Sequence, residues 1–318
     1  MHRIVYLDRA SIRARMRRPA FPHEWIELPQ CERADVVAQL AGATIAISNK
    51  VPIDRSAMEA LPDLRMIAVA ATGTNQIDLA AARERGIVVS NIRGYAVNTV
   101  PEQVIAMLFA LSRNLFAYRA AVAEGEWQKS TQFCLFHHPI RDLHGQTLAI
   151  VGRGNLGEGV ARRAEALGMR VVYAERKGAA TVRPGYIAFD AALAQADAIT
   201  LHCPLTDATR SIIGEREFAL MKPHAILVNT ARGGLVDEAA LAAALRAGRI
   251  GGAAFDVLTE EPPVRGNVLL DPALLALPNF LLTPHCAWAS EPAMQTLSDQ
   301  LVDNIEAFVA GRPRNVVT

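Results

Sequence analysis

The chain has 318 residues, a length that suggests two domains of roughly 150 residues each. Hydrophobic residues make up 51% and charged residues 20%, which excludes a disordered chain, a collagen-like chain and a small disulfide scaffold. Lysine and arginine total 33 against 32 aspartate and glutamate, a net charge of +1. A net charge this small gives no overall electrostatic attraction for nucleic acid or an acidic membrane, and we expect neither as a partner.

The cysteines are too scattered to form a zinc site or a disulfide framework, so we expect no metal. They are Cys31, Cys134, Cys203 and Cys286. This usage favours a reducing compartment, and we expect a cytoplasmic protein. The longest apolar runs, such as Val104–Leu111, are far shorter than the ~20 residues of a membrane span.

The first hundred residues alternate between short apolar runs and helical patterns, which predicts a β/α unit. Strands are expected at Ile4–Leu7, Thr44–Ser48, Met66–Ala70 and Gly86–Ser90, and helices at Ala34–Leu40 and Leu79–Arg85. The arginine-rich stretch from Arg9 to Arg18 lacks interleaved aromatics. We interpret it as a solvated helix face rather than a nucleic-acid patch. Leucines at helical spacing then predict one long helix over Val100–Ala123.

From residue 148 onward the alternation becomes regular and predicts a parallel sheet covered by helices on both faces. Six strands are expected at Leu148–Val151, Arg170–Ala174, Ala198–Leu201, Ala225–Asn229, Gly252–Val257 and Phe280–Thr283. Helices are expected at Leu156–Leu167, Glu215–Met221 and Asp237–Ala247, with a final helix at Met294–Val309. The predicted class is α/β, with two Rossmann-like or flavodoxin-like domains.

A glycine loop, Gly152-Arg153-Gly154-Asn155-Leu156-Gly157, matches G-x-G-x-x-G between a predicted strand and a predicted helix. In such a loop Gly152 would allow the tight turn and Gly154 the approach of backbone N–H groups to a pyrophosphate. Gly157 would let the helix pack on the strand. The alternative is a glycine-rich turn without a ligand. The context of strand, loop and helix favours a dinucleotide site.

An acid follows at the spacing that such a site requires, because Glu175 lies 18 residues past Gly157, at the end of the next strand. Its carboxylate would accept hydrogen bonds from the adenosine ribose hydroxyls and repel a 2′-phosphate, which favours NAD over NADP. Arg176 and Lys177 follow directly, and either would reach a 2′-phosphate. The sequence therefore predicts NAD and leaves NADP open.

Charged residues suited to 2-oxo acid chemistry follow the later strands, at the sheet edge where such folds bind ligands. Arg232 offers a planar fork for a carboxylate. His285 is the natural acid near neutral pH, and Glu261 beside it would favour the imidazolium. Asp256 would hold the carboxamide or ribose of the nicotinamide. Taken singly, His285 is equally well a core histidine and Glu261 part of a surface pair.

Five segments together resemble the D-isomer-specific 2-hydroxyacid dehydrogenases over nearly the whole chain. They are Val151–Gly157, His202–Thr209, Asn229–Val236, Asp256–Pro263 and Thr283–Ala289. Within that family, the stretches NTVPEQV and QFCLFHHPI look most like bacterial glycerate dehydrogenases, also called hydroxypyruvate reductases.

The resemblance implies a catalytic set of Arg232, Glu261 and His285. It also implies cofactor contacts, several of them made by residues already described. The full expected set is Gly152, Gly154, Asn155, Leu156, Gly157, Glu175, Arg176, Cys203, Pro204, Thr209, Thr230, Ala231, Arg232, Asp256 and His285. The substrate would be bound by Thr72, Gly73, Thr74, Arg232, His285 and Trp288. Trp288 is expected either to sense the third carbon of the substrate or to be a core aromatic.

The resemblance further implies a substrate-binding domain made of residues 1–99 and 289–318, with an NAD(P)-binding Rossmann domain, 100–288, inserted into it. The substrate would sit in the cleft between them. Members of the family are homodimers, so we expect the apolar run Phe133–Phe136 to lie at a subunit interface. The alternative is burial under its own domain.

The predicted activity is NAD(P)H-dependent reduction of a small 2-oxo acid to the D-2-hydroxy acid, with hydroxypyruvate or glyoxylate as the first choice. Two alternatives use the same fold. One is a dinucleotide-sensing binding protein, like the corepressors of the C-terminal binding protein type. The other is a further dehydrogenase of the family, such as phosphoglycerate dehydrogenase.

Overall fold

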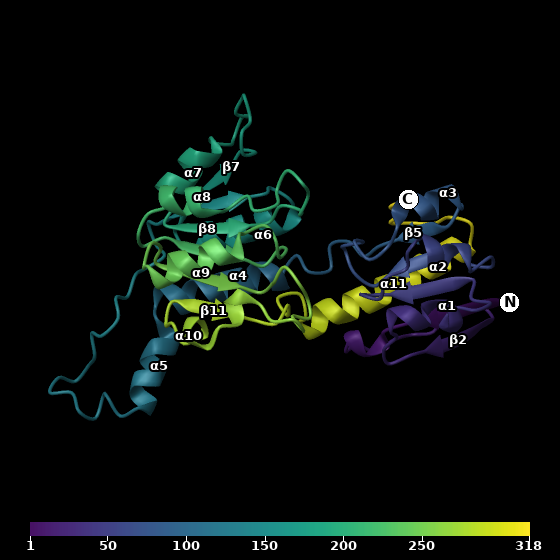
Figure 1. Ribbon diagram of the computed structural model, residues 1–318, viewed down its shortest axis with the longest axis horizontal. Coiled ribbons are helices and arrows are strands. Elements are labelled where there is room, and N and C mark those ends of the chain that lie inside the picture. Colours follow the sequence, from purple (N-terminus) through teal and green to yellow (C-terminus); the bar gives the residue numbers. More distant parts are fainter. The chain divides into compact units, whose positions relative to one another are not determined.

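The computed structural model describes residues 1–318 and divides into two compact units (Figure 1). Unit 1 comprises Met1–Tyr95 and Ala289–Thr318, and unit 2 comprises Ala96–Trp288. The first division therefore lies four residues before the expected boundary at 99/100. The carbonyl of Ala96 already accepts a hydrogen bond from the N–H of Val100, which ties Ala96 to the start of the following helix.

Unit 1 is built on a five-stranded parallel sheet in the order β2-β1-β3-β4-β5. Its strands are β1 (His2–Tyr6), β2 (His23–Glu27), β3 (Ile45–Ser48), β4 (Met66–Val69) and β5 (Val88–Ser90). Its α-helices are α1 (Val36–Gln39), α2 (Arg55–Glu59), α3 (Leu79–Glu84) and α11 (Glu291–Val309), with 3₁₀ turns at Arg9–Ser11 and Arg33–Asp35. The central strands β3 and β4 are buried throughout, as expected for a sheet covered on both faces.

The prediction of a helix face in the arginine-rich stretch is wrong. Only Arg9–Ser11 form a 3₁₀ turn, and the chain beyond is irregular until β2. Arg17 instead donates to Glu306 and Asp303 of α11, at 2.7 and 2.6 Å. Acidic partners far along the chain therefore hold this segment, and such partners give no local sequence signal.

Unit 2 is built on a six-stranded parallel sheet in the order β11-β10-β9-β8-β6-β7. Its strands are β6 (Thr147–Val151), β7 (Arg170–Ala174), β8 (Ala198–Leu201), β9 (Ile226–Asn229), β10 (Gly252–Phe255) and β11 (Phe280–Leu282). Its helices are α4 (Thr99–Ser112), α5 (Leu115–Ala123), α6 (Asn155–Ala166), α7 (Phe189–Gln195), α8 (Glu215–Leu220), α9 (Glu238–Arg246) and α10 (Pro272–Leu275), with a 3₁₀ turn at Val268–Leu270. Two parallel α/β units confirm the predicted fold class.

Both faces of this sheet are buried, and the alternation along β6 shows it. Leu148 and Ile150 pack with apolar residues of α4 and α6, whereas Ala149 and Val151 pack with those of α7, α8 and α9. Successive side chains of a strand point to opposite faces, so a strand between two helical layers is apolar throughout. The ends of these buried strands carry the loops that contain most of the predicted site residues.

The single helix predicted over Val100–Ala123 is in fact two helices, α4 and α5. Asn114 separates them in the left-handed conformation, with φ +49°. Asparagine tolerates this conformation better than most residues. No single helix combines the length and hydropathy needed to cross a bilayer. Only α4 and α5 taken together pass that test, and they are bent by 55°.

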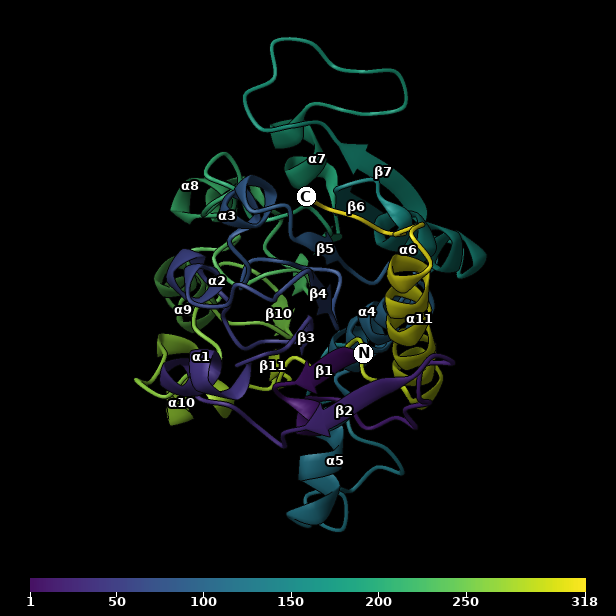
Figure 2. The ribbon, with the colours of Figure 1, turned by 90° about the vertical axis from the view of Figure 1, so that its right-hand side faces the viewer.

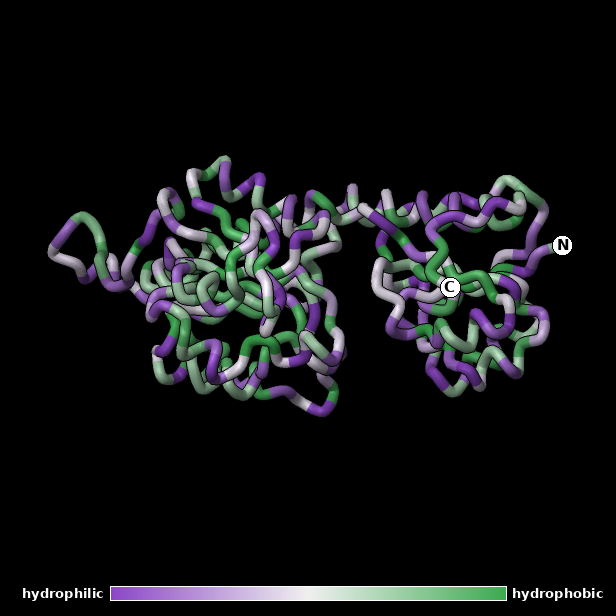
Figure 3. The backbone as a smooth tube through the Cα atoms, turned by 90° about the horizontal axis from the view of Figure 1, so that it is seen from above, coloured by the Kyte–Doolittle hydropathy of each residue, from purple (hydrophilic) through white to green (hydrophobic).

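Helix α5 and the loop after it extend away from the body of unit 2 (Figure 1). The loop includes a hydrophobic stretch, visible as green between purple segments in Figure 3. Phe133 is 89% exposed and Phe136 is 84% exposed. The alternative that this run is buried under its own domain is therefore wrong.

Candidate active site

The strand order of unit 2 reverses at β6, whose neighbours are β7 on one side and β8 on the other. In open α/β sheets the crevice at such a reversal, outside the carboxyl ends of the strands, is where ligands bind. The glycine loop begins there, directly after Val151. The last residue of β6 bonds the segment after β8, because the N–H of His202 donates to the carbonyl of Val151 at 2.8 Å.

The three glycines of the loop differ in their surroundings, and so in the reason why each position favours glycine. Gly152 has φ +108°, and a Cβ there would lie 2.6–2.7 Å from the backbone of His202 and Cys203. A Cβ on Gly157 would lie 2.2 Å from the carbonyl oxygen of Gly152. Gly154 differs from both, because a Cβ on it would meet nothing within 4 Å. Gly154 therefore faces open space, where a ligand has room to approach the backbone.

Helix α6 begins at this open position. Its N-cap residue is Gly154, and no side chain caps the helix. The first-turn N–H groups are thus available to an anion, in the field of a 12-residue helix. Asn155 is exposed and Leu156 half-buried at the same end. These residues fit the pyrophosphate of a dinucleotide.

Glu175 follows β7 as predicted, but its carboxylate is already bonded. Its side chain is 3% exposed and accepts hydrogen bonds from Arg183 Nε and Nη2, both at 2.7 Å. The backbone N–H groups of Arg176 and Arg183 also donate to it, at 2.8 and 3.0 Å. These bonds, that of the Arg183 side chain above all, lower the pKa of Glu175 to about 2. The sequence did not predict Arg183.

The remaining predicted cofactor residues lie on the loops after β8 and β9. Thr209 donates to the carbonyl of Pro204 at 2.7 Å, which shapes the loop that begins with half-buried Cys203. Thr230 is 8% exposed, and its buried Oγ1 has no hydrogen-bond partner. Ala231 follows it, with its N–H bonded to Asn229. An unpartnered buried hydroxyl is costly, so its presence at this edge fits a residue that hydrogen-bonds a bound cofactor.

His285 and Glu261 lie together, as predicted. Nδ1 of His285 is 2.5 Å from Oε2 of Glu261, and Oε1 of Glu261 accepts from the N–H of Leu258 at 2.9 Å. The two side chains are 27% and 32% exposed, so the pair is accessible. The other ring nitrogen, Nε2, makes no hydrogen bond within the chain. His202, the other histidine at this edge, is held neutral because burial lowers its pKa to about 4.

Asp256 holds the loop that carries His285. Its carboxylate accepts from the N–H groups of Cys286 and Ala287, at 3.0 and 2.8 Å, and from the Thr283 hydroxyl at 2.5 Å. Asp256 is 1% exposed, and these bonds explain why a carboxylate is buried at this position. From the sequence, Asp256 is instead expected to contact the cofactor. A contact between Asp256 and the nicotinamide stays a prediction.

The same loop is fastened at two further points. Trp288 Nε1 donates to the carbonyl of His285 at 2.9 Å, and the Thr99 hydroxyl of α4 donates to the carbonyl of Ala287 at 3.0 Å. His285 itself has φ +52°, a conformation rare outside glycine. The indole of Trp288 therefore helps to position His285. A contact between Trp288 and the substrate stays a prediction.

Arg232 stands on the turn after β9 and is half-buried. The Asn229 side-chain amide donates to its carbonyl at 2.9 Å, and Nη1 of Arg232 donates to the carbonyl of Ala231 at 2.6 Å. A Cβ on Gly233 would lie 1.8 Å from the carbonyl oxygen of Leu258, so this turn packs against the segment that leads to Glu261. Arg232 makes no direct hydrogen bond to Glu261 or His285.

The predicted substrate-binding residues Thr72, Gly73 and Thr74 belong to one loop of unit 1. Thr72 follows β4 and its hydroxyl donates to the carbonyl of Ile92 at 2.8 Å, while its own carbonyl accepts from the Asn91 amide. The carbonyl of Thr74 accepts from the N–H of Ile77. These hydrogen bonds, all within unit 1, hold the loop that contains half-buried Gly73.

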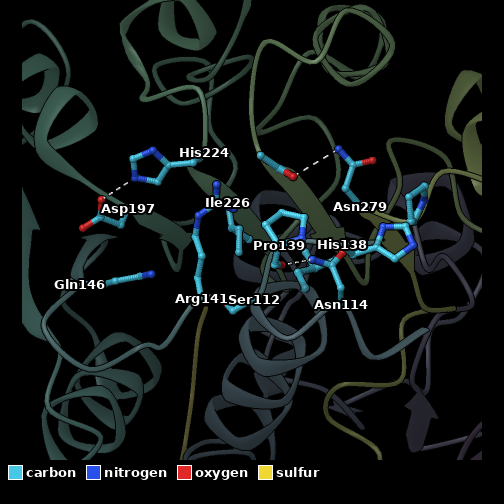
Figure 4. Close-up of a pocket in the computed structure, with 13 residues that line it drawn as sticks. Ser112, Asn114, His138, Pro139, Arg141, Gln146, Asp197, His224, Ile226 and Asn279 are labelled. Atoms are coloured by element: carbon cyan, nitrogen blue, oxygen red, sulfur yellow. Dashed lines mark hydrogen bonds and ion pairs between the residues drawn. The ribbon is translucent and has the colours of Figure 1, made fainter. Parts of the chain in front are cut away.

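A cavity of about 180 Å³ opens at the opposite edge of the unit 2 sheet. Figure 4 shows Asp197, Ile226 and Asn279 around it, each at the amino end of a strand. Asp197 is bound by His224 Nε2 at 2.9 Å and by Lys222 at 2.7 Å. This cavity contains none of the predicted site residues. No group of three or more His, Cys, Asp or Glu side chains is arranged to hold a metal ion.

Comparisons with known proteins agree with these features. A family profile for the NAD binding domain of D-isomer specific 2-hydroxyacid dehydrogenases matches residues 105–287. A glycerate dehydrogenase of Methylorubrum extorquens is 53% identical, over 99% of this chain and 98% of that protein. A hydroxypyruvate reductase of Blautia hydrogenotrophica is 35% identical, over 89% of this chain and 87% of that one.

A solved structure extends the similarity to three dimensions. The NADPH-dependent glyoxylate/hydroxypyruvate reductase of Sinorhizobium meliloti superimposes with a TM-score of 0.82 at 28% identity. The match covers 100% of this chain and 98% of that one. The family predicted from the motifs is confirmed: the chain belongs to the D-isomer-specific 2-hydroxyacid dehydrogenases.

Proposed function

We propose that this dehydrogenase reduces hydroxypyruvate or glyoxylate to the corresponding D-2-hydroxy acid, with His285 as the proton donor. The observation that carries the proposal is the 2.5 Å contact between His285 Nδ1 and Glu261, which leaves Nε2 for the substrate. The names of the relatives support the substrate class, since the proteins at 53% and 35% identity are a glycerate dehydrogenase and a hydroxypyruvate reductase.

The carboxylate of Glu261 stabilises positive charge on His285, so the imidazolium donates from Nε2 to the carbonyl oxygen as reduction proceeds. In the reverse direction neutral His285 takes the hydroxyl proton at the same atom. Asp256 keeps the histidine in place throughout by holding the backbone of residues 286 and 287. A group held in this way needs no reorganisation at the moment of proton transfer.

Arg232 supplies the fixed positive charge that an anionic 2-oxo acid requires. Its planar fork suits a carboxylate, or a carboxylate oxygen together with the carbonyl oxygen of the substrate. The backbone amides of Thr72, Gly73 and Thr74 are proposed to bind the substrate carboxylate, with Trp288 near the third carbon. On this proposal residues 1–99 and 289–318 form the substrate-binding domain.

NAD(P)H, when bound, supplies the hydride. The residues proposed to hold it are the glycine loop, with its uncapped helix end and open Gly154, and the loops that follow β7, β8, β9 and β10. Within this set the hydroxyl of Thr230 has no hydrogen-bond partner, and the carboxylate of Glu175 is the acid proposed to lie at the adenosine ribose. Residues 100–288 are thus the proposed NAD(P)-binding domain.

A homodimer is part of the proposal. Seven large hydrophobic residues of α5 and the following loop are about half exposed or more: Leu115, Phe116, Val122, Trp127, Phe133, Phe136 and Ile140. Exposed apolar groups concentrated on one projecting segment mark an interaction surface. A second copy of this chain is the proposed occupant.

The proposal is tested by following NADH and NADPH absorbance with hydroxypyruvate, glyoxylate, pyruvate and bulkier 2-oxo acids. We expect the highest kcat/KM with hydroxypyruvate or glyoxylate. A higher value for a bulky 2-oxo acid would contradict the proposed substrate. Absence of oxidation with every acid of the panel would favour a dinucleotide-sensing protein instead.

A further inference from the structure

The acid at the end of β7 has a charged partner that the sequence pattern does not reveal. Arg183 lies eight residues past Glu175 and grips both oxygens of its carboxylate through Nε and Nη2. Four hydrogen bonds in all reach this carboxylate, two from the Arg183 side chain and two from backbone N–H groups.

The chain after Glu175 folds back toward the end of β7, which brings Arg183 to the Glu175 carboxylate. The N–H of Glu175 donates to the carbonyl of Ile187, and the N–H of Ile187 donates to the carbonyl of Tyr173, which returns the chain to the end of β7. The intervening loop projects beyond the rest of unit 2 (Figures 1 and 2). The guanidinium carbon of Arg183 lies 4.1 Å from the centre of the Tyr186 ring, a cation–π contact that adds a second partner for the guanidinium.

The two hydrogen bonds from Arg183 change how the Glu175 carboxylate can interact with a cofactor. A bare carboxylate at this position accepts ribose hydroxyls and repels a 2′-phosphate. Here the charge of the carboxylate is offset by a guanidinium at 2.7 Å, and its oxygens are shared with that group. A ribose diol must compete with Arg183 for Glu175, whereas a 2′-phosphate meets a cation beside it.

Arg183 retains the capacity to bind that phosphate. Its fork to Glu175 uses two of the five N–H donors of a guanidinium, and its side chain is 50% exposed. Lys177, by contrast, is turned away, because its Nζ lies 2.9 Å from Glu217 and donates to the carbonyl of Ile212. Arg176 is exposed next to Glu175 and adds positive charge at the same place.

We propose that Arg183 is a specificity-determining residue that makes this site accept NADP as well as NAD. It neutralises Glu175 and donates its free N–H groups to the 2′-phosphate. This inference rests on the proposed placement of the adenosine ribose at Glu175, and it does not depend on the identity of the 2-oxo acid.

The test is calorimetric titration of the full, nucleotide-free protein with NAD⁺ and NADP⁺, and with the fragments 5′-AMP and 2′,5′-ADP. The unaltered protein should bind NADP⁺ within about tenfold of NAD⁺. Arg183→Gln should weaken NADP⁺ and 2′,5′-ADP by about 10- to 100-fold, as expected for loss of charge-assisted hydrogen bonds. NAD⁺ and 5′-AMP should bind equally well or up to a few-fold tighter.

Two further variants keep the test sharp. Arg183→Lys retains the charge without the fork and should preserve part of the NADP⁺ affinity. Arg246→Gln is the matched control, because Arg246 is 46% exposed and pairs with Asp271 on a different part of unit 2. It should leave both affinities unchanged.

Equal weakening of NAD⁺ and NADP⁺ in Arg183→Gln would overturn the inference, since it would mean that Arg183 only supports the loop. An unchanged NADP⁺ affinity, or the same shift in Arg246→Gln, would overturn it too. If Arg183→Gln shifts the NADP⁺/NAD⁺ ratio while hydroxypyruvate and glyoxylate are not reduced, the proposed substrate is wrong and the inference on Arg183 is supported.

Discussion

Oε2 of Glu261 lies 2.5 Å from Nδ1 of His285, although 24 residues separate them in the chain. The contact occupies one ring nitrogen and leaves Nε2 for the proton transfer that we propose. It forms because two loops meet at the carboxyl edge of the sheet, one after β10 and one after β11, which are neighbouring parallel strands. The pairing of acid and histidine is thus a product of strand order.

Replacing His285 with alanine removes the proposed proton donor. We expect kcat to fall by about two to four powers of ten, the usual contribution of a general acid. NAD⁺ affinity should change little, because the glycine loop and Glu175 remain. Steady-state kinetics and calorimetric titration measure the two effects separately. His224→Ala, at the opposite edge of the sheet, is the matched control and should keep kcat within a few-fold; an equal loss there would argue against a specific role for His285.

Asp256→Asn should misplace His285 although the Asp256 side chain forms no hydrogen bond with the imidazole. The new amide nitrogen would face a backbone N–H that now donates to the carboxylate, and neither donor would have an acceptor. Because Asp256 is only 1% exposed, water cannot replace the lost bond, so we expect the free energy of unfolding to fall by about 1–3 kcal/mol. kcat should fall at least tenfold. Hydrogen exchange at residues 285–288 should accelerate. Thr283→Val removes only the hydroxyl contact and should have a smaller effect on all three measurements; normal exchange in Asp256→Asn would refute the holding role.

Two alanine substitutions in the glycine loop should have opposite consequences. Gly152→Ala places a Cβ 2.6–2.7 Å from the backbone of His202 and Cys203, at φ +108°, so the protein should be destabilised. Gly154→Ala meets no protein atom within 4 Å and should leave Tm nearly unchanged. Its methyl would occupy the space proposed for the pyrophosphate, so NAD⁺ affinity should fall at least tenfold. Unaltered affinity in Gly154→Ala would remove the pyrophosphate from that position.

The sequence was sufficient for the strands of unit 2, because each of them contains a short apolar run, whereas the short helices α7 and α10 were not predicted. β7 and β8 have the bounds that were predicted. In unit 1 the edge strand β2 was missed, since His23–Glu27 is only partly buried and includes charged residues. Its place depends on pairing with β1, which no local pattern encodes. The break at Asn114 was also missed, because the apolar spacing continues through it.

The candidate site was predictable where a local spacing encodes it, as in the glycine loop and the acid at position 175. It was not predictable where partners meet through the fold. Asp256 was assigned to the cofactor, yet its oxygens bind the loop 27–31 residues further on. Arg183 was missed because nothing in the sequence shows that the chain returns to Glu175 after eight residues.

The pKa of Glu175, lowered to about 2 chiefly by the Arg183 side chain, gives a pH prediction. A carboxyl whose pKa is lower in the folded than in the unfolded state stabilises the fold above its unfolded value of about 4.5. That stability is lost as the pH falls toward 2. The Tm difference between the unaltered protein and Glu175→Gln should therefore be constant above about pH 5 and shrink below it. A constant difference down to pH 3 would mean that the ion pair adds nothing to folding.

The exposed phenylalanines of the projecting loop predict the assembly state. Phe133 and Phe136 are 89% and 84% exposed, so changing both to serine should remove little packing within their own unit. If a second copy covers them, burial of each ring is worth about 1.5–3 kcal/mol, so the double change should shift a dimer toward monomer. Sedimentation should then give the chain mass of 34.4 kDa in place of twice that value. Val264→Ser, at a residue 80% exposed elsewhere in unit 2, is the matched control and should leave the mass unchanged. A monomeric unaltered protein, or a double variant that still sediments as a dimer, would exclude this loop as the interface.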